Sequence, residues 1–247
     1  MHSASPRRIP ILTYHQVGRF APADVRRQRG NYVDAARFAD QVRVLHRLGY
    51  WAVTLAQVGE WLAGRGTLPP RPVVFTFDDA YANVFEHAYP TLLRRGWPAT
   101  TFVVTHELGG VNRWDLPRGI PASPLMDTPQ LRALSAAGWE IGAHSRSHPR
   151  LTELIGERCA EEVAGSRADL EALLGRPVTS WCYPYGAANP AVVAAVRAAG
   201  YRAAVTLQPG HARPASAPLL LPRIHVGYRL GWRRFLWRLL VAGFRSA

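Results

Sequence analysis

The sequence contains no lysine, very little sulfur and no long hydrophobic run. Its two cysteines, Cys159 and Cys182, cannot form a framework of several disulfides and do not lie in a Cys-x-x-Cys pattern, so we expect small buried side chains. No apolar run approaches the roughly 18 residues that span a bilayer, and no apolar signal-peptide core follows the N-terminus. We therefore expect a cytoplasmic or membrane-peripheral protein, with export left open.

The charge is one-sided, because all 30 basic residues are arginine and the formal net charge is +13. Such an excess favours an acidic partner. However, the body of the chain shows no basic patch interleaved with aromatic residues, so we do not predict a nucleic-acid partner. The mixed charges of residues 157–171 are typical of an ordinary solvated helix face.

Short runs of β-branched and aromatic residues alternate with longer amphipathic stretches, which indicates an α/β protein with a parallel sheet or barrel. We expect one domain at residues 9–228, after a tail at 1–8 and before a C-terminal segment at 229–247. The predicted strands are 9–14, 51–54, 72–77, 99–104, 139–143, 178–182, 202–206 and 219–224. The predicted helices are 35–48, 56–63, 82–95, 129–137, 157–174 and 190–199.

The C-terminal segment is a basic amphipathic stretch. Residues 231–247 place Trp232, Phe235, Leu236, Leu239 and Leu240 on one helical face, with Arg233, Arg234 and Arg238 on another. We expect this helix to pack on the rest of the domain. The alternative is peripheral contact with a membrane surface.

Asp78 and Asp79 follow the apolar run 73–77, at the strand edge where α/β folds assemble their active sites. Successive strand residues point to opposite faces, so one carboxylate can bind a metal while the other accepts a proton. The alternative is that the two residues cap a helix starting at Tyr81.

His144 and His148 follow the predicted strand 139–143 and therefore lie at the same edge as Asp78 and Asp79. If Ser145–His148 forms one helical turn, both rings lie on one face and reach a single ion. Two histidines and one aspartate leave coordination positions open, which is typical of a catalytic metal site.

Two further segments complete the candidate site. Tyr183-Pro184-Tyr185-Gly186 is a strand end followed by a turn, which can direct a backbone N–H into the site as an oxyanion donor. Residues 107–129 are rich in glycine and proline, and we expect a functional loop over one end of the sheet.

Together these motifs resemble the polysaccharide deacetylase family (carbohydrate esterase family 4, the NodB-homology domain). The matching residues are Thr76-Phe77-Asp78-Asp79, then His144-Ser145-Arg146-Ser147-His148, then Tyr183-Pro184-Tyr185-Gly186. The resemblance spans roughly residues 9–226. It implies an irregular (β/α)₇ barrel, with Asp79, His144 and His148 as ligands of a divalent metal, usually Zn²⁺. It further implies that Asp78 is the general base and that Tyr185 lends its backbone N–H to the oxyanion hole.

Two positions depart from the family pattern. The usual Asp-Asp-Gly ends in Ala80, which costs little if the backbone there is not left-handed. Cys182 stands where the family usually has the arginine that pairs with the base. A permuted branch, which includes poly-N-acetylglucosamine deacetylases, instead carries a late Pro-Arg-Ile and an early Tyr-His. We therefore assign the pairing role to Arg223 and the catalytic acid to His15, with His225 as the alternative acid.

The predicted function is metal-dependent hydrolysis of N-acetyl, or alternatively O-acetyl, groups on a polysaccharide or amino-sugar oligomer. We expect Trp51, Trp114, Tyr81, Tyr183 and Tyr185 to ring the open end of the barrel, where aromatic faces can stack on sugars. Two alternatives are a deacylase of a lipid-linked sugar at the membrane surface and a catalytically inactive carbohydrate-binding protein of the same fold.

Overall fold

The computed structural model describes residues 8–20, 30–228, 230 and 232–241. Of the predicted tail at residues 1–8, only residue 8 lies within this range. Residues 229, 231 and 242–247 of the predicted C-terminal segment lie outside the described residues as well.

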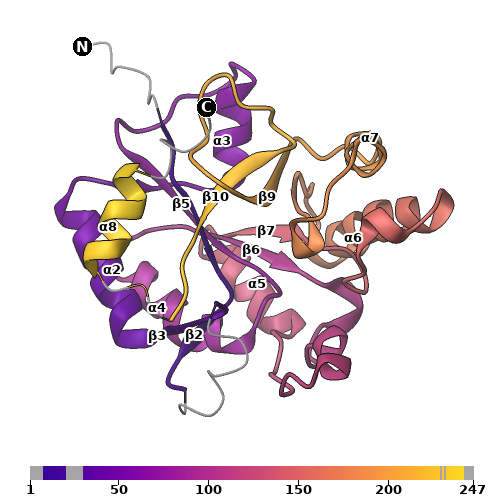
Figure 1. Ribbon diagram of the computed structural model, residues 1–247, viewed down its shortest axis with the longest axis horizontal. Helices are drawn as coiled ribbons and strands as arrows, with labels where there is room; N and C mark the ends of the chain where they lie inside the picture. The colour runs from indigo at the N-terminus through magenta and orange to yellow at the C-terminus, as the bar shows by residue number, and fades with distance from the viewer. Residues whose placement is uncertain (1–7, 21–29, 229, 231, 242–247) are drawn as a thin grey trace.

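Parallel strands form a closed ring at the centre of the molecule (Figure 1). The strands of this sheet are β1 (Ile11–Tyr14), β4 (Trp51–Ala52), β5 (Pro72–Phe77), β6 (Thr100–Val103), β7 (Glu140–Ala143), β8 (Ser180–Cys182), β9 (Ala203–Pro209) and β10 (Leu221–His225). Because β1 pairs with both β10 and β5, the sheet closes on itself, while β4 pairs only with β5. Seven of these eight described strands therefore form the ring, which confirms the predicted (β/α)₇ barrel.

Helices surround the ring. The α-helices are α2 (Ala35–Arg47), α3 (Leu55–Leu62), α4 (Tyr89–Leu93), α5 (Thr128–Ala136), α6 (Glu157–Leu174), α7 (Pro190–Ala198) and α8 (Trp232–Val241). Short helical turns are η1 (Val84–Ala88), η2 (Thr105–Glu107), η3 (Arg113–Arg118), η4 (Leu151–Glu153) and η5 (Pro184–Gly186). Capping boxes fix the starts of α3 and α5, where Thr54 pairs with Gln57 and Asp127 with Gln130.

Two local predictions differ from the structure. The helix predicted over residues 82–95 is present from residue 82 to residue 93, but residues 84–88 within it form the π-helical turn η1, which runs directly into α4. Pro90 lies at the start of α4 and has no N–H to continue the α-helical ladder, which accounts for the π-helical turn that precedes it. The small parallel pair β2 (Gln16–Gly18) and β3 (Tyr32–Asp34) was not predicted, because its three-residue strands are too short for a visible alternation.

The alternation along β5 determines where its terminal carboxylates lie. Phe75 and Phe77 belong to one buried cluster of the core, whereas Val74 belongs to the other. Thr76 is buried on the same side of the strand as Val74. Asp78 continues this second series by one step, so the strand delivers its carboxylate to the interior at the carboxyl end of the barrel.

The helix α8 packs on the body of the protein beside α2 (Figure 1), through the buried side chains of Phe235 and Leu239. This agrees with the expected packing of the segment. Trp232 was expected on the same apolar face but is 56% exposed, because it is the first residue of the helix and lies beyond the packed face. Among the described residues, the structure contains no helix with the length and apolar character needed to cross a bilayer.

Candidate active site

Asp78 forms a buried ion pair with Arg223, which reaches it from β10. The guanidinium donates from Nη1 to Oδ1 at 2.7 Å and from Nη2 to Oδ2 at 2.8 Å. Arg223 is itself held by the carbonyl of Thr206 and the hydroxyl of Thr76. Although burial opposes ionisation, the charge and hydrogen bonds of Arg223 hold the pKa of Asp78 well below its usual range. The structure thus brings Arg223 to the place where the family's usual arginine is missing.

The small side chain of Cys182 lies next to the Arg223–Asp78 ion pair. Its Sγ lies 3.3 Å from Nη2 of Arg223, so the thiol borders the space that the guanidinium fills. Burial raises the pKa of the Cys182 thiol, and the neutral form is therefore favoured. Both cysteines are buried and free, as expected from the sequence.

Asp79, His144 and His148 bring three ligand atoms together on the other side of the site. The His144 Nε2 lies 3.3 Å from Oδ1 of Asp79, the His148 Nε2 lies 3.4 Å from the same oxygen, and the two nitrogens are 3.2 Å apart. Ligands of a tetrahedral zinc ion at ~2.0–2.1 Å lie about 3.3 Å from one another. The triangle therefore fits a divalent metal with a further position open.

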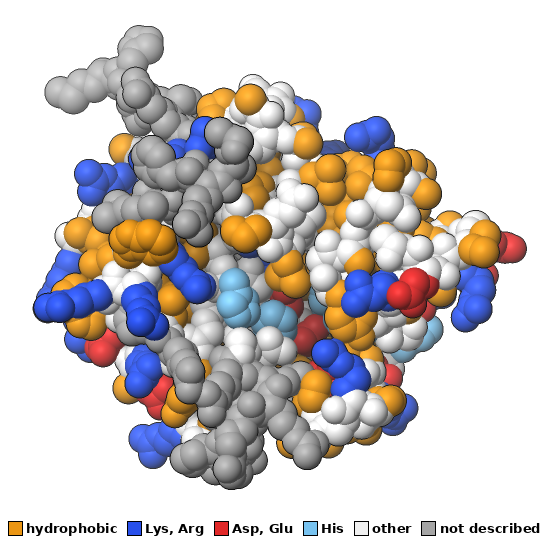
Figure 2. Space-filling view, viewed as in Figure 1, with side chains coloured by type: hydrophobic (Ala, Val, Ile, Leu, Met, Phe, Trp, Pro, Cys, Tyr) orange, Lys and Arg blue, Asp and Glu red, His pale blue; other side chains and the backbone are white. Residues whose placement is uncertain are grey.

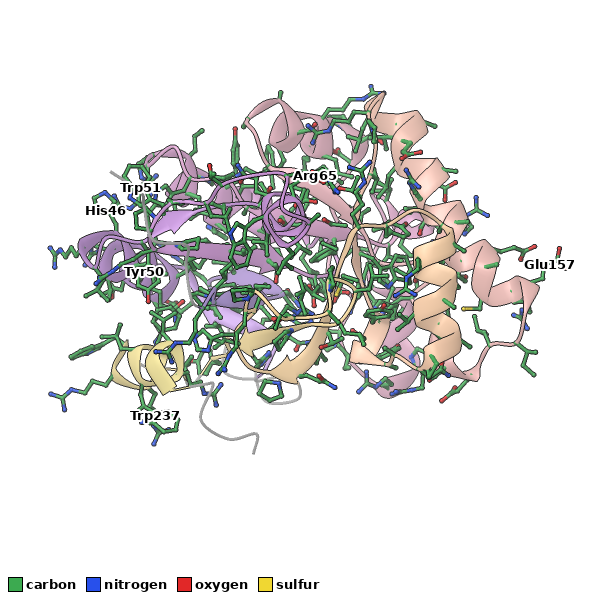
Figure 3. The ribbon with its side chains drawn as sticks, turned by 90° about the horizontal axis from the view of Figure 1, so that it is seen from above. His46, Tyr50, Trp51, Arg65, Glu157 and Trp237 are labelled. Carbon is green, nitrogen blue, oxygen red and sulfur yellow. The ribbon has the colours of Figure 1, made fainter. Side chains whose placement is uncertain are left out.

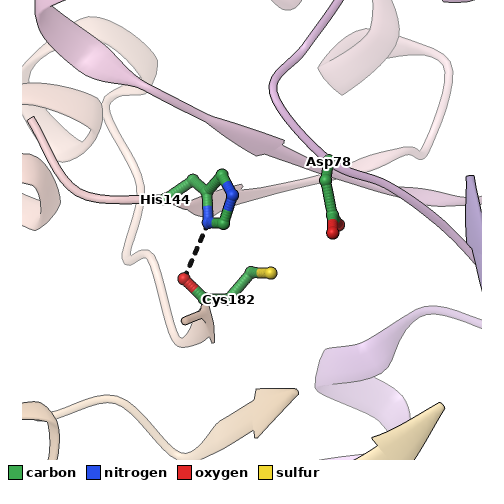
Figure 4. Close-up of side chains that lie close together, drawn as sticks. All are labelled: Asp78, His144 and Cys182. Atoms are coloured by element: carbon green, nitrogen blue, oxygen red, sulfur yellow. Dashed lines mark hydrogen bonds between the residues drawn. The ribbon is translucent and has the colours of Figure 1, made fainter. Parts of the chain in front are cut away.

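The chemistry of these three donors also fits a metal. The His144 Nδ1 donates its hydrogen to the Cys182 carbonyl at 2.8 Å (Figure 4), so Nε2 is the nitrogen that faces Asp79. Although burial opposes ionisation, Cys182 and Asp79 raise the pKa of His144, and a metal ion would take the place of the Nε2 proton. Burial lowers the pKa of His148 to about 3 and keeps that ring neutral. Asp79 Oδ1 is buried, with no hydrogen-bond partner among the described residues. A buried carboxylate oxygen without a partner is costly unless a cation binds it.

Asp78, His144 and Cys182 form a second group of potential ligands (Figure 4). This group is a poorer metal site, because both carboxylate oxygens of Asp78 already accept hydrogen bonds from Arg223. In addition, the thiol of Cys182 is held in its protonated form, whereas zinc binds the thiolate.

The segment between the two histidines is not the helical turn that the spacing suggested. Ser145 has φ = 67° and His148 has φ = 60°, both in the left-handed region, which a right-handed helical turn excludes. The Ser145 hydroxyl accepts a hydrogen bond from the His148 N–H at 2.9 Å. The rings still converge, but through a tight turn in place of the helical i,i+4 relation.

The backbone after the Asp pair is left-handed as well, with φ = 69° at Asp79 and 54° at Ala80. The helix-cap alternative is therefore wrong, since no described hydrogen bond joins either carboxylate to the backbone N–H groups of the helix that begins at residue 82. Ala80 costs little only if its backbone is not left-handed, and this condition is not met. Ala80 occupies a conformation that glycine adopts without strain.

His15 and His225 lie across the same cavity. The Nε2 of His15 is 3.9 Å from Oδ2 of Asp78, and the centroids of the two imidazole rings are 6.4 Å apart. Burial, with the nearby His15, lowers the pKa of His225 to about 4. His225 is thus neutral near pH 7 and has no second proton to give.

A cavity of about 270 Å³ opens over these groups. The space-filling view shows the histidines and acidic groups at the bottom of a hollow near the centre of the face (Figure 2). The segment 107–129 supplies Trp114, Asp115 and Arg118 to its wall, as expected for a loop over the site. Trp114 stacks on the ring of His148 with centroids 4.6 Å apart, and the ring of Tyr185 lies 4.6 Å from His148 on another side. Asn31 and Leu207 also line the wall, and no sequence pattern marks them as site residues.

The expected ring of aromatic residues is only partly present. Tyr183 lines the cavity but is almost fully buried, and Tyr81 is a core residue. Trp51 is wrong as a site residue, because β4 pairs it with Pro72 at the opposite end of β5 from Asp78. Its side chain is exposed at the edge of the molecule (Figure 3).

Known proteins of similar sequence and structure belong to one family. The sequence profile "Polysaccharide deacetylase" matches residues 65–204. The putative polysaccharide deacetylase YxkH of Bacillus subtilis is 26% identical over 223 residues, which are 90% of this chain and 72% of that protein. The poly-beta-1,6-N-acetyl-D-glucosamine N-deacetylase of Staphylococcus aureus is 24% identical over 204 residues, covering 78% of this chain and 68% of that protein.

Solved structures agree. IcaB from Ammonifex degensii superposes with a TM-score of 0.78 at 26% identity, over 95% of this chain and 98% of that one. The deacetylase PplD of Streptococcus pyogenes, in complex with acetate, has the same fold, with a TM-score of 0.81 at 24% identity over 95% and 99% of the two chains. The chain belongs to the polysaccharide deacetylase family, hydrolases that act on carbon–nitrogen bonds other than peptide bonds.

Proposed function

We propose that this protein is a metal-dependent deacetylase that removes N-acetyl groups from a polysaccharide or oligosaccharide of amino sugars. The observation that carries the proposal is the pairing of two differently placed carboxylates. Asp79 joins two histidines at a metal-binding triangle, while Asp78 is held by Arg223 beside it. The relatives named for N-acetylglucosamine polymers support the choice of substrate class.

Asp79, His144 and His148 would hold the ion, for which Zn²⁺ is the first choice because the donors are nitrogen and carboxylate oxygen at tetrahedral spacing. When bound, zinc would lower the pKa of a water molecule towards ~7 and polarise the acetyl carbonyl.

The chain's own groups would move the protons. Asp78 is ionised and buried at the floor of the cavity, where its carboxylate accepts the proton of the attacking water. The backbone N–H of Tyr185, at the rim, donates to the oxygen that becomes negatively charged. His15, across the cavity from the metal ligands, protonates the departing sugar amine. We prefer His15 to His225 because burial keeps His225 neutral.

The cavity wall suits a sugar ring. Trp114 and Tyr185 offer aromatic surface next to His148, and the volume of about 270 Å³ accommodates little more than one acetylated sugar unit. The neighbouring units of a polymer would therefore lie along the open face of the barrel.

The direct test is an assay of the purified zinc form against N-acetylated glucosamine oligomers and O-acetylated glycans. We expect acetate release from the N-acetylated oligomers, and its loss in the Asp78→Asn variant. A protein that binds zinc but releases no acetate from any of these glycans would instead be a carbohydrate-binding protein.

A second candidate, a deacylase of lipid-linked sugars at an anionic membrane surface, is favoured by the outer face of α8. Trp237 is 61% exposed on that face and extends away from the body of the protein (Figure 3), with the exposed residues Arg233 and Arg234 beside it. Deleting the helix would also remove the core residues Phe235 and Leu239, so point variants are the better test.

The membrane test uses sedimentation with phosphatidylglycerol-containing and purely zwitterionic vesicles. We expect binding to the anionic vesicles that decreases in Trp237→Ala and in an Arg233→Gln/Arg234→Gln double variant, with unchanged hydrolysis of soluble oligomers. Equal recovery of all proteins in the supernatant would reject this candidate.

A further inference from the structure

The turn that carries the two histidine ligands has an unfavourable backbone conformation. Ser145 and His148 are both left-handed, although neither is glycine. L-residues adopt this conformation at a cost in free energy, and such residues persist only where surrounding contacts hold them. The contacts that hold this turn come largely from outside it.

The helix α6 supplies one of these contacts through Glu162. Its Oε2 accepts hydrogen bonds from the backbone N–H groups of Arg146 at 2.8 Å and Ser147 at 3.0 Å. Its Oε1 accepts from the Ser147 hydroxyl at 2.5 Å. One carboxylate thus satisfies two consecutive backbone N–H donors of the turn. Because the acceptor is charged, these hydrogen bonds are stronger than bonds between neutral groups.

Asp169, two turns further along α6, holds the same segment by its side chain. Its Oδ2 accepts from Arg146 Nε at 2.9 Å and its Oδ1 from Arg146 Nη2 at 2.8 Å. The hydroxyl of Thr105 donates to Oδ2 at 2.7 Å, and the Thr105 N–H donates to the Ser145 carbonyl at 3.2 Å. Asp169 therefore connects the turn to the end of β6 as well as to α6.

The Arg146 side chain can reach Asp169 because residue 165 of α6 is glycine. A Cβ atom at Gly165 would overlap with both Cζ and Nε of Arg146. The guanidinium therefore lies directly against the helix backbone, in the space that any larger side chain would fill.

We propose that Glu162 and Asp169 are positioning residues for the metal ligands, and that they hold the 145–148 turn so that the rings of His144 and His148 converge on one ion. This inference rests on the proposed metal site. A simple surface ion pair would contribute little. Glu162 differs because it accepts from the backbone of the strained turn itself, between the two ligands.

The test is the zinc affinity of the full-length protein, measured by competition with a chromogenic chelator, together with the visible absorption spectrum of the Co²⁺ form. We expect Glu162→Ala to bind zinc about 10–100-fold more weakly, as outer-shell substitutions do. We also expect its Co²⁺ spectrum to change. Glu162→Gln keeps an oxygen for the two N–H groups and should recover most of the affinity.

Glu161→Ala is the matched control, because it removes the same charge from an exposed position on the same helix. Glu161 makes no hydrogen bond to the turn among the described contacts. It should bind zinc as the wild type does. Equal affinities for Glu161→Ala, Glu162→Ala and the wild type would overturn the inference while leaving the metal site intact. Absence of zinc binding by the wild type would overturn the proposed function, and this inference with it.

Gly165→Ala provides a test that does not depend on removing a stabilising group. Alanine has a higher helix propensity than glycine, so the substitution should not lower the melting temperature of the metal-free protein by weakening the helix α6 itself. The new Cβ displaces Arg146 from Asp169, and we expect zinc affinity to fall by about the same 10–100-fold as in Glu162→Ala. A Gly165→Ala protein with wild-type zinc affinity would contradict the role of Asp169.

Discussion

The guanidinium of Arg223 and the carboxylate of Asp78 form a bidentate pair in which both side chains are almost completely buried. A buried charge pair of this kind is sensitive to the loss of either partner, because the remaining charge is left without compensation. The pair also explains why the chain can have Cys182 where its family usually has arginine. The positive charge reaches Asp78 from β10 instead of β8.

Replacing Arg223 with lysine should move the acidic limb of the pH–rate profile to higher pH. Arg223 lowers the pKa of Asp78, and a lysine cannot reproduce the two parallel hydrogen bonds, so the pKa of Asp78 rises towards its usual value. The base is then protonated, and activity lost, at a higher pH than in the wild type. Because a pKa near the usual value still leaves Asp78 ionised at pH 7, the shift should appear in the acidic limb, and kcat at neutral pH should fall only through poorer orientation of the carboxylate.

The matched control for that experiment is Arg202→Lys, which changes an exposed arginine bound to Glu60. Its pH profile should coincide with that of the wild type. An acidic limb that stays in place in Arg223→Lys would show that Arg223 does not tune the base.

Asp79→Ala and His148→Ala should lose zinc and activity together. Each variant removes one of three ligand atoms that lie 3.2–3.4 Å apart. Zinc binds the folded form, so adding it should raise the melting temperature of the wild type but not that of the two variants. Metal analysis and thermal melts of His46→Ala, an exposed histidine far from the site in sequence, provide the control. Full activity in zinc-free protein would contradict the metal assignment.

The two candidate acids should behave differently when each is replaced by asparagine. We expect His15→Asn to lower kcat by about 10²–10⁴-fold, since it removes the group proposed to protonate the departing amine. His225→Asn should lower kcat much less, because burial lowers the pKa of His225 to about 4 and its ring is already neutral. A large loss of kcat only in His225→Asn would reverse the assignment.

Ala80→Gly should cost less stability than an alanine-to-glycine change elsewhere in the core. Glycine relieves the left-handed conformation at φ = 54°, which costs an alanine about 1–2 kcal/mol. Ala204→Gly removes an equally buried methyl group from β9 without such relief. Chemical denaturation should therefore show Ala80→Gly to be about 1–2 kcal/mol less destabilising than Ala204→Gly. Equal losses of stability would mean that Ala80 is not strained.

The main parts of the site could be predicted because parallel strands bring their carboxyl ends to one edge. Asp78 and His144 both follow apolar runs, and this alone places them together. The left-handed turn between His144 and His148 could not be predicted, since serine and histidine carry no local signal for positive φ.

Other features depend on contacts between distant parts of the chain. Glu162 and Asp169 look like part of a solvated helix face in the sequence, and only the packing of α6 against the 145–148 turn reveals their contacts. Trp51 is the first residue of its strand and therefore borders the amino ends of the parallel strands, so its expected place at the open carboxyl end was wrong.

The most direct test of the account is the simultaneous measurement, by NMR, of acetate and free amino groups during reaction of the zinc-loaded protein with an N-acetylglucosamine oligomer. We predict that both appear in equal amounts, and that neither appears with the Asp78→Asn variant or after removal of the metal. Absence of reaction with the zinc-loaded wild type, or acetate release from O-acetylated but not N-acetylated glycans, would contradict the proposed N-deacetylase.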